Sequence, residues 1–218
     1  MIVSEMQTRT AFLIDDNSGK NYSPSDLTMA LNIGQDNVAK EFVNLGVGWF
    51  EQAADLNPAG VPAGTINNQE LYALPLDFIK MVRCERSDSG LPLVPINMND
   101  KMVSGTQLPI VQAIYSYFIT GNYLGINPLP PGGIPVRLWY AYLLPRLVLI
   151  SDTSQIPINW HDMVCVSAAL DFIGKDEGNT TNLWKKWDRY MTQLHQSEGS
   201  RQIQMPRGVT QTHSSYGN

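Results

Sequence analysis

The sequence predicts an α+β protein, in which a helical bundle core carries an inserted small antiparallel β module and an extended C-terminal arm. Three observations lead to this class. Residues 1–48 and 151–194 have helical periodicity and form the N-terminal and C-terminal helices of the core. Residues 49–150 contain short runs rich in Val, Ile, Tyr and Phe that Pro and Gly interrupt, as in the strands of a small sheet. Residues 195–218 are polar and form the arm.

Two helices are expected in residues 1–48. The first spans about Glu5 to Leu13, and the second begins after Ser23, where Pro24 follows the capping residue and Asp26 is the third position. The second helix should bury one stripe and end at the glycines that follow Leu45. The stripe expected to be buried is Leu27, Leu31, Val38, Phe42 and Leu45. The residues expected to point elsewhere are Gln35, Asp36, Lys40 and Glu41.

The β module contains two hairpin signals. The first is Ser87–Gly90, and the second is Gly121–Asn122 between the strand-like residues 113–120 and 123–126. A further strand over Val136–Leu144 closes the module. The pattern therefore predicts an antiparallel sheet with tight turns.

Two more helices complete the core. The first is capped by Asn159 and runs from Trp160 to Ile173, and the second begins at Thr180. Apolar residues of the second helix recur every three or four positions, so they are expected to pack on the first helix. These residues are Leu183, Trp184, Trp187, Tyr190, Met191 and Leu194.

Composition and charge narrow the function classes. The chain has 218 residues, of which 16% are charged, against an average of about 25%. Its net charge is −5, and a sequence-reading nucleic-acid protein would need a dense basic surface instead. No signal peptide is expected at the start, and the apolar stretch Leu138–Ile150 is too short to span a membrane. Low surface charge favours extensive contact with other subunits.

We find no pattern of residues that would support catalysis or metal binding. His161, His195 and His213 lack the partner spacing of a zinc site, and Cys84 and Cys165 are expected to be buried free thiols. The chain has neither a Gly-x-Ser-x-Gly motif nor a phosphate-binding glycine loop. We therefore expect a protein that is not an enzyme and has no cofactor and no metal.

Four stretches, taken in order and spacing, carry a resemblance to a known family. They are Leu31–Asn32 with Ala39–Phe42; Tyr72–Phe78 with Met81–Glu85; Ile126–Pro130 with Arg137–Tyr142, Pro145 and Leu147; and Trp160–Asp162 with the amphipathic helix that ends the core. Over roughly residues 22–194 the chain resembles the head-to-tail adaptor (connector) proteins of tailed bacteriophages that have a β module inserted into a helical core.

The resemblance implies a structural virion protein without catalytic residues. About a dozen copies, a homododecamer, would form a ring that docks under the portal protein and continues the DNA channel to the tail. The partners it implies are the portal, further copies of the chain, a tail or nozzle protein below, and DNA that passes without sequence-specific binding. Such a neck protein assembles in the host cytoplasm and serves genome packaging and ejection.

The arm supplies the residues expected to contact the portal. Its apolar residues are too sparse to bury a core but are spaced as separate anchors, and two arginines can add charge-assisted contacts. These residues are Arg201, Ile203, Met205, Arg207, Val209 and Tyr216.

Two alternative functions stay open at this point. One is a tail-completion or stopper ring, one layer further from the portal. The other is a β module that binds a small ligand or a glycan, with Trp139, Tyr140 and Tyr142 as stacking surfaces.

Overall fold

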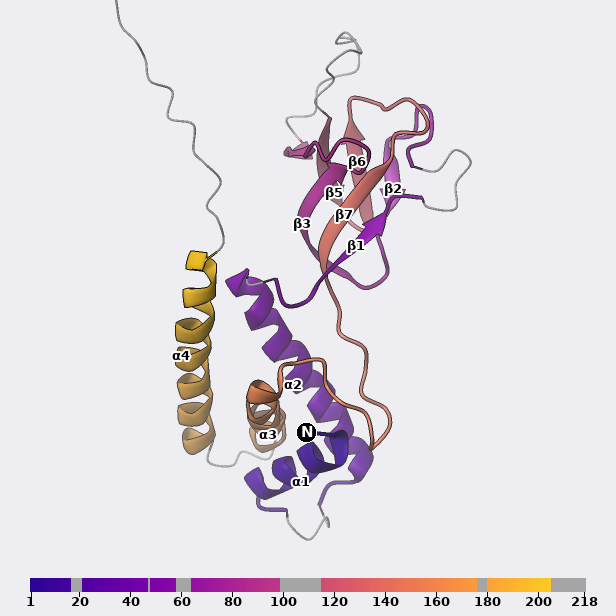
Figure 1. Ribbon diagram of the computed structural model, residues 1–218. Coiled ribbons are helices and arrows are strands. Elements are labelled where there is room, and N and C mark those ends of the chain that lie inside the picture. Colours follow the sequence, from indigo (N-terminus) through magenta and orange to yellow (C-terminus); the bar gives the residue numbers. More distant parts are fainter. Residues whose placement is uncertain (17–20, 47, 58–63, 99–114, 176–179, 205–218) are drawn as a thin grey trace, which may run out of the picture. The chain divides into compact units, whose positions relative to one another are not determined.

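The computed structural model describes residues 1–16, 21–46, 48–57, 64–98, 115–175 and 180–204, with the side chains of residues 174–175 and 199–204 left out. Its described part contains four α-helices and two β-sheets, so the protein has the mixed α+β class that the sequence predicts (Figure 1). The chain divides into two compact units. One comprises Met1–Trp49 and Pro145–Asn218, and the other Phe50–Leu144.

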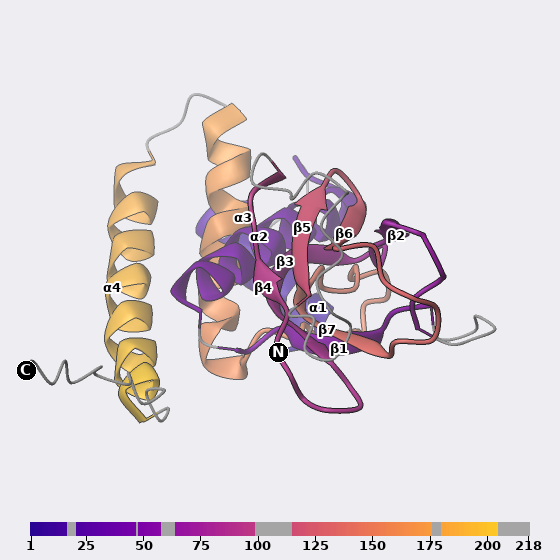
Figure 2. The ribbon, with the colours of Figure 1, turned by 90° about the horizontal axis from the view of Figure 1, so that it is seen from above.

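The first unit, which we call the helical unit, is organised around α3. It contains α1 (Val3–Leu13), α2 (Pro24–Leu45), a short 3-10 turn η3 (Ile158–Trp160), α3 (His161–Lys175) and α4 (Thr181–Gln204). α3 packs against α1, α2 and α4. Figure 2 shows α4 running alongside α3. The apolar faces of the other helices are therefore buried mainly against one helix.

α2 begins and ends where the sequence predicts. The Ser23 hydroxyl accepts a hydrogen bond from the Asp26 backbone N–H at 3.2 Å, and the Asp26 carboxylate accepts one from the Ser23 N–H at 3.0 Å. This reciprocal pair satisfies two N–H groups that have no partner inside the helix. At the other end Gly46 has φ 67°, a left-handed conformation that glycine adopts without steric cost.

α2 approaches α3 closely at Gly34. A methyl group at this position would lie 2.5 Å from the carbonyl oxygen of Val164, which is closer than such atoms can pack. Ala168 lies on the next turn of α3, and it is fully buried. Small residues at the crossing therefore let the two backbones come together.

The expectation that Gln35 points away from the core is wrong. Its side chain is 1% exposed, its Nε2 donates to the Pro145 carbonyl at 3.0 Å, and its Oε1 accepts from the Ser154 hydroxyl at 2.6 Å. A buried amide is stable where both ends are hydrogen-bonded. Both partners are more than 100 positions away in sequence, so helical periodicity alone assigned Gln35 to the wrong face.

The expectation that Asn159 caps α3 is also wrong. Asn159 lies inside the 3-10 turn η3, which follows Pro157, and α3 proper begins at His161. The Trp160 N–H donates to the Pro157 carbonyl at 2.8 Å. The turn thus starts the helical path before Asn159, so this residue lies inside the turn and not at the cap position.

The second unit, which we call the β unit, contains two sheets. One has the strand order β1-β7-β3 and the other β2-β6-β5-β4, and all pairs are antiparallel except β4 with β5. The strands are β1 (Glu51–Asp55), β2 (Leu71–Ala73), β3 (Phe78–Arg86), β4 (Val94–Pro95), β5 (Ser116–Thr120), β6 (Tyr123–Asn127) and β7 (Val136–Tyr142).

Both predicted turns are confirmed. Thr120 pairs with Tyr123 across a two-residue connection, and Gly121 has φ 54°, as a tight hairpin needs at its first central position. In the other turn the Gly90 N–H donates to the Arg86 carbonyl at 2.8 Å. The turn chemistry of the sequence was therefore sufficient to locate these reversals.

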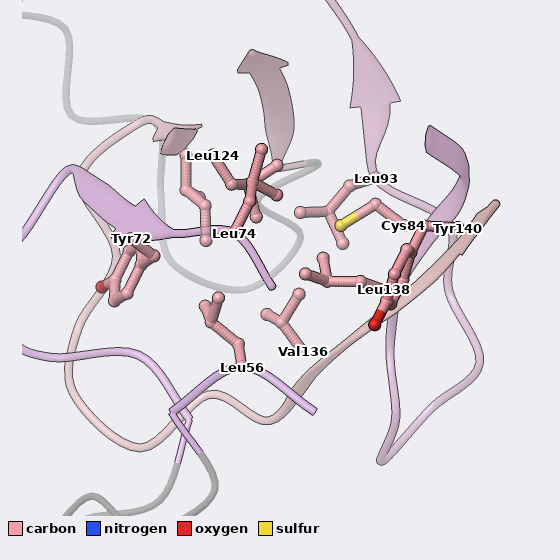
Figure 3. Close-up of a cluster of buried hydrophobic side chains, with 10 residues drawn as sticks. Leu56, Tyr72, Leu74, Cys84, Leu93, Leu124, Val136, Leu138 and Tyr140 are labelled. Carbon is pink, nitrogen blue, oxygen red and sulfur yellow. The ribbon is translucent and has the colours of Figure 1, made fainter. Parts of the chain in front are cut away.

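The β unit has its own apolar core between the two sheets. Alternate side chains of β7 point into it, and strands from both sheets contribute the rest (Figure 3). Its buried members are Leu56, Tyr72, Leu74, Cys84, Leu93, Leu124, Ile126, Val136, Leu138 and Tyr140.

Gly34→Ala should destabilise the protein because the added methyl group meets backbone and not a flexible side chain. Alanine gains about 1 kcal/mol of helix propensity. Overpacking costs about 1–3 kcal/mol, so the net change should be unfavourable. Urea unfolding of the variant, compared with Lys40→Ala at an exposed position of the same helix, measures this difference. A Gly34→Ala variant as stable as the wild type would show that α2 and α3 can separate at no cost.

Candidate assembly surface

Within the described residues, no group of three or more His, Cys, Asp or Glu side chains is placed to hold a metal ion. The two cysteines are buried and free, as the sequence predicts. Burial raises the pKa of each thiol, Cys84 and Cys165, to about 12. A thiol that stays protonated at neutral pH is a poor nucleophile, so neither cysteine has the character of a catalytic residue.

His161 has a structural role in the helical unit. Its ring is 1% exposed, its Nε2 donates to the Ile156 carbonyl at 2.7 Å, and its Nδ1 accepts from the Met1 nitrogen at 2.8 Å. Burial lowers the pKa of His161 below its usual value of 6.5. The neutral ring therefore joins the start of α3 to the chain before it.

The three aromatic residues expected to form a ligand-stacking surface do not share one face. Tyr140 is buried in the core of the β unit, and its hydroxyl donates to Asp77 Oδ1 at 3.1 Å. Trp139 lies on the opposite face of β7, where its Nε1 donates to Glu85 at 2.9 Å. Tyr142 is half-buried against the same core. Strand alternation therefore separates Trp139 from the two tyrosines and weakens the glycan-binding alternative.

α4 is held on the helical unit along its length. Leu183 near its start and Leu194 in its second half are buried, 5% and 0% exposed. Beyond Leu194, Glu198 is also buried, and its carboxylate accepts a hydrogen bond from Trp49 Nε1 at 3.1 Å. These contacts continue past the expected end of the core at residue 194.

The helix therefore replaces the first part of the expected extended arm. α4 continues to Gln204, so residues 195–204 are helical, and the prediction of an extended arm is wrong for them. That prediction rests on the polar composition of this segment. However, extending an existing helix is far easier than nucleating one, and Gln, Glu and Arg are good helix formers.

The residues expected to contact the portal lie at and beyond this helix end. Arg201 and Ile203 belong to the last turns of α4, where the backbone alone is described. Met205, Arg207, Val209 and Tyr216 fall outside the described residues. Their role as portal contacts stays a prediction.

Trp184 was expected to belong to the core, and this is wrong. Its side chain is 52% exposed, and Trp187 is half-buried. Both line an open groove of about 340 Å³ between α2, α3 and α4. The other residues that line it are Asn37, Lys40, Glu41, Ser167, Leu170 and Asp171. The first turns of α4 therefore present an aromatic ring to solvent.

A second apolar surface was not anticipated from the sequence. Val148, Leu149 and Ile150 are 73%, 62% and 67% exposed in the loop that precedes η3. The sequence does contain a sign of this surface, because the apolar run continues past Pro145, after the alternation of β7 has ended. From the sequence, the β module is expected to extend to residue 150, whereas the helical unit resumes at Pro145.

A model of the SU10 adaptor protein family matches residues 1–210, nearly the whole chain. The chain belongs to this family. It is therefore a structural adaptor protein of a phage and a component of the virion, a class that is not enzymatic. No curated protein matches the chain significantly.

The helical unit of the adaptor exposes large apolar side chains on its surface. None of the described helices is both long and apolar enough to cross a membrane. Large exposed apolar patches on a folded protein commonly mark contacts with other proteins. The Val148–Ile150 loop and the exposed Trp184 are thus the candidate assembly surfaces of the helical unit.

Leu194→Ala should destabilise the adaptor by about 2–5 kcal/mol because it removes a fully buried side chain. Trp184→Ala should change stability by less than about 1 kcal/mol because half of the ring already faces solvent. Chemical denaturation of both variants compares the two positions. Equal losses would mean that Trp184 packs as tightly as Leu194.

The adaptor should lose stability as the pH falls below about 6.5, because unfolded His161 then takes up a proton that the folded protein resists. Because the pKa of His161 is lowered in the folded protein, the stability that its neutral ring contributes is fully present above pH 6.5. This stability is lost progressively as the pH falls from 6.5 towards the pKa of His161 in the folded protein. One proton corresponds to at most about 1.4 kcal/mol per pH unit. Unfolding free energies at several pH values should fall less steeply in His161→Gln. Parallel profiles would contradict this role.

Proposed function

We propose that the adaptor forms a head-to-tail ring that docks beneath the phage portal and continues the DNA channel towards the tail. The family match over residues 1–210 carries this proposal. In it, the helical unit is a bundle core that forms the ring, the β unit is a module inserted into that core, and about a dozen copies close the ring, as in cyclic assemblies generally. The neck of the virion is its final location, after assembly in the host cytoplasm.

The surface chemistry of the described residues supports an assembly role. The helical unit exposes large apolar side chains on a loop and on a helix, and low overall charge reduces the cost of bringing copies together. The net charge of −5 suits a channel that DNA passes without being held. This combination favours a structural component of the neck over an enzyme or a glycan-binding protein.

The C-terminal end of the chain is the proposed portal contact. α4 is anchored as far as Glu198 and runs to Gln204, so residues 205–218 start from a defined helix end. Apolar side chains spaced along a segment can each fill a separate pocket on a partner, and repetition around a ring multiplies their effect. The proposed contacts are Arg201, Ile203, Met205, Arg207, Val209 and Tyr216.

Deleting residues 205–218 should abolish or sharply weaken capture of the adaptor by portal while leaving the melting temperature unchanged. The cut is made after Gln204 because removal from Gln196 would also delete the buried Glu198. A pull-down with purified portal, together with circular dichroism melts, measures both quantities.

A matched variant keeps the length of the chain and replaces Met205, Val209 and Tyr216 with serine. It should lose capture as the deletion does. Full capture of both variants would exclude the C-terminal contact and direct attention to the helical body. Capture by a tail protein but not by portal would favour a stopper ring.

A further inference from the structure

The exposed Val148–Ile150 loop is held rigidly by α2. Asn32 Nδ2 donates to the Leu147 carbonyl at 3.0 Å, and the Leu147 N–H donates back to Asn32 Oδ1 at 2.8 Å. One turn later Gln35 donates to the Pro145 carbonyl. Asp36, on the same helix, accepts a hydrogen bond from Arg146 at its Oδ2, at 2.7 Å. Three polar residues of α2 thus bind the three consecutive residues that lead into the loop.

The other end of the loop is held by Asp152 and α1. The N–H groups of Val148 and Leu149 each donate to Asp152 Oδ2 at 2.8 Å, and these two bonds lower the pKa of the Asp152 carboxyl. The Ser4 N–H donates to the Ile150 carbonyl at 3.1 Å. The backbone is therefore fixed while the apolar side chains point outward. Such a surface pays little ordering entropy when it binds.

The loop and α4 lie on opposite sides of the helical unit. Figures 1 and 2 show the turn of the loop that follows β7 on the far side of the unit from α4. Because the two apolar surfaces differ and lie on opposite sides of the helical unit, each copy can bind the next one head to tail. Contacts of this heterologous kind generate rings when the rotation between copies closes.

Charge also differs between the two surfaces. The charged side chains that bind the loop segment are Asp36, Asp152 and Arg146, a net of −1 from two carboxylates and one guanidinium. The exposed face of α4 and the groove beside it together have a net charge of +1, from four cations and three carboxylates. These are Lys40, Lys185, Lys186 and Arg189, and Glu41, Asp171 and Asp188. Opposite net charge favours contact between the two surfaces and disfavours contact of either with itself.

We propose that the Val148–Ile150 loop of one copy packs against the exposed face of α4, around Trp184, on the next copy. This inference rests on the proposed ring and names its lateral contact. The groove beside Trp184, with Leu170 and Trp187 in its wall, offers apolar surface for the aliphatic side chains.

A mixed cross-linking experiment tests this contact. One full-length chain carries Leu149→Cys and a second carries Trp184→Cys, and they are mixed, oxidised and analysed for disulfide-linked dimers. The native Cys84 and Cys165 are buried and should not react. The mixture should give several-fold more dimer than either chain alone. The control pairs Trp184→Cys with Phe12→Cys, which is 61% exposed on α1 and outside both surfaces.

The reaction is run on free protein at high concentration and on protein captured by portal. A mixed dimer above the control in either sample supports the contact. Portal capture with no dimer above the control, or a dominant Leu149→Cys homodimer, overturns it while the proposed function stands. If the portal does not capture the adaptor, the result counts against the proposed function. In that case the yield of mixed dimer in the free sample, compared with the control, decides whether the contact exists.

Discussion

The helical unit depends on how closely α2 approaches α3 at Gly34. Because a side chain there would collide with the Val164 carbonyl, glycine permits a crossing in which backbone meets backbone. The close approach buries Val38, Phe42 and the apolar face of α3. α1 and α4 then pack on α3, so one crossing determines the position of the other helices.

The same crossing orients the polar side of α2 towards the chain that returns from β7. Asn32 binds Leu147, Gln35 binds the Pro145 carbonyl, and Asp36 binds Arg146. Asp152 accepts hydrogen bonds from the N–H groups of Val148 and Leu149. The loop would lose these hydrogen bonds if it turned its side chains inward. The exposure of Val148, Leu149 and Ile150 is therefore a consequence of how the loop is held, and it provides a rigid surface for assembly.

Local signals in the sequence located most elements of the fold. The Ser23–Asp26 cap, Gly46 and the Gly121 hairpin act within a few residues, so each could be identified without the tertiary structure. The misplaced residues depend on distant partners: Gln35 binds Pro145 and Ser154, and Glu198 binds Trp49. Trp184 has the right helical spacing for the core but lies at the edge of the buried stripe. Periodicity predicts a stripe and not its width.

We propose that the adaptor forms a ring through its helical unit and docks on the portal. Electron cryomicroscopy of the two purified proteins in mixture tests it most directly. We expect a closed ring of adaptor copies on one end of the portal, with the Val148–Ile150 loop of each copy facing α4 of its neighbour. Portal particles that carry no adaptor, or adaptor copies bound singly and without contact between them, would contradict it.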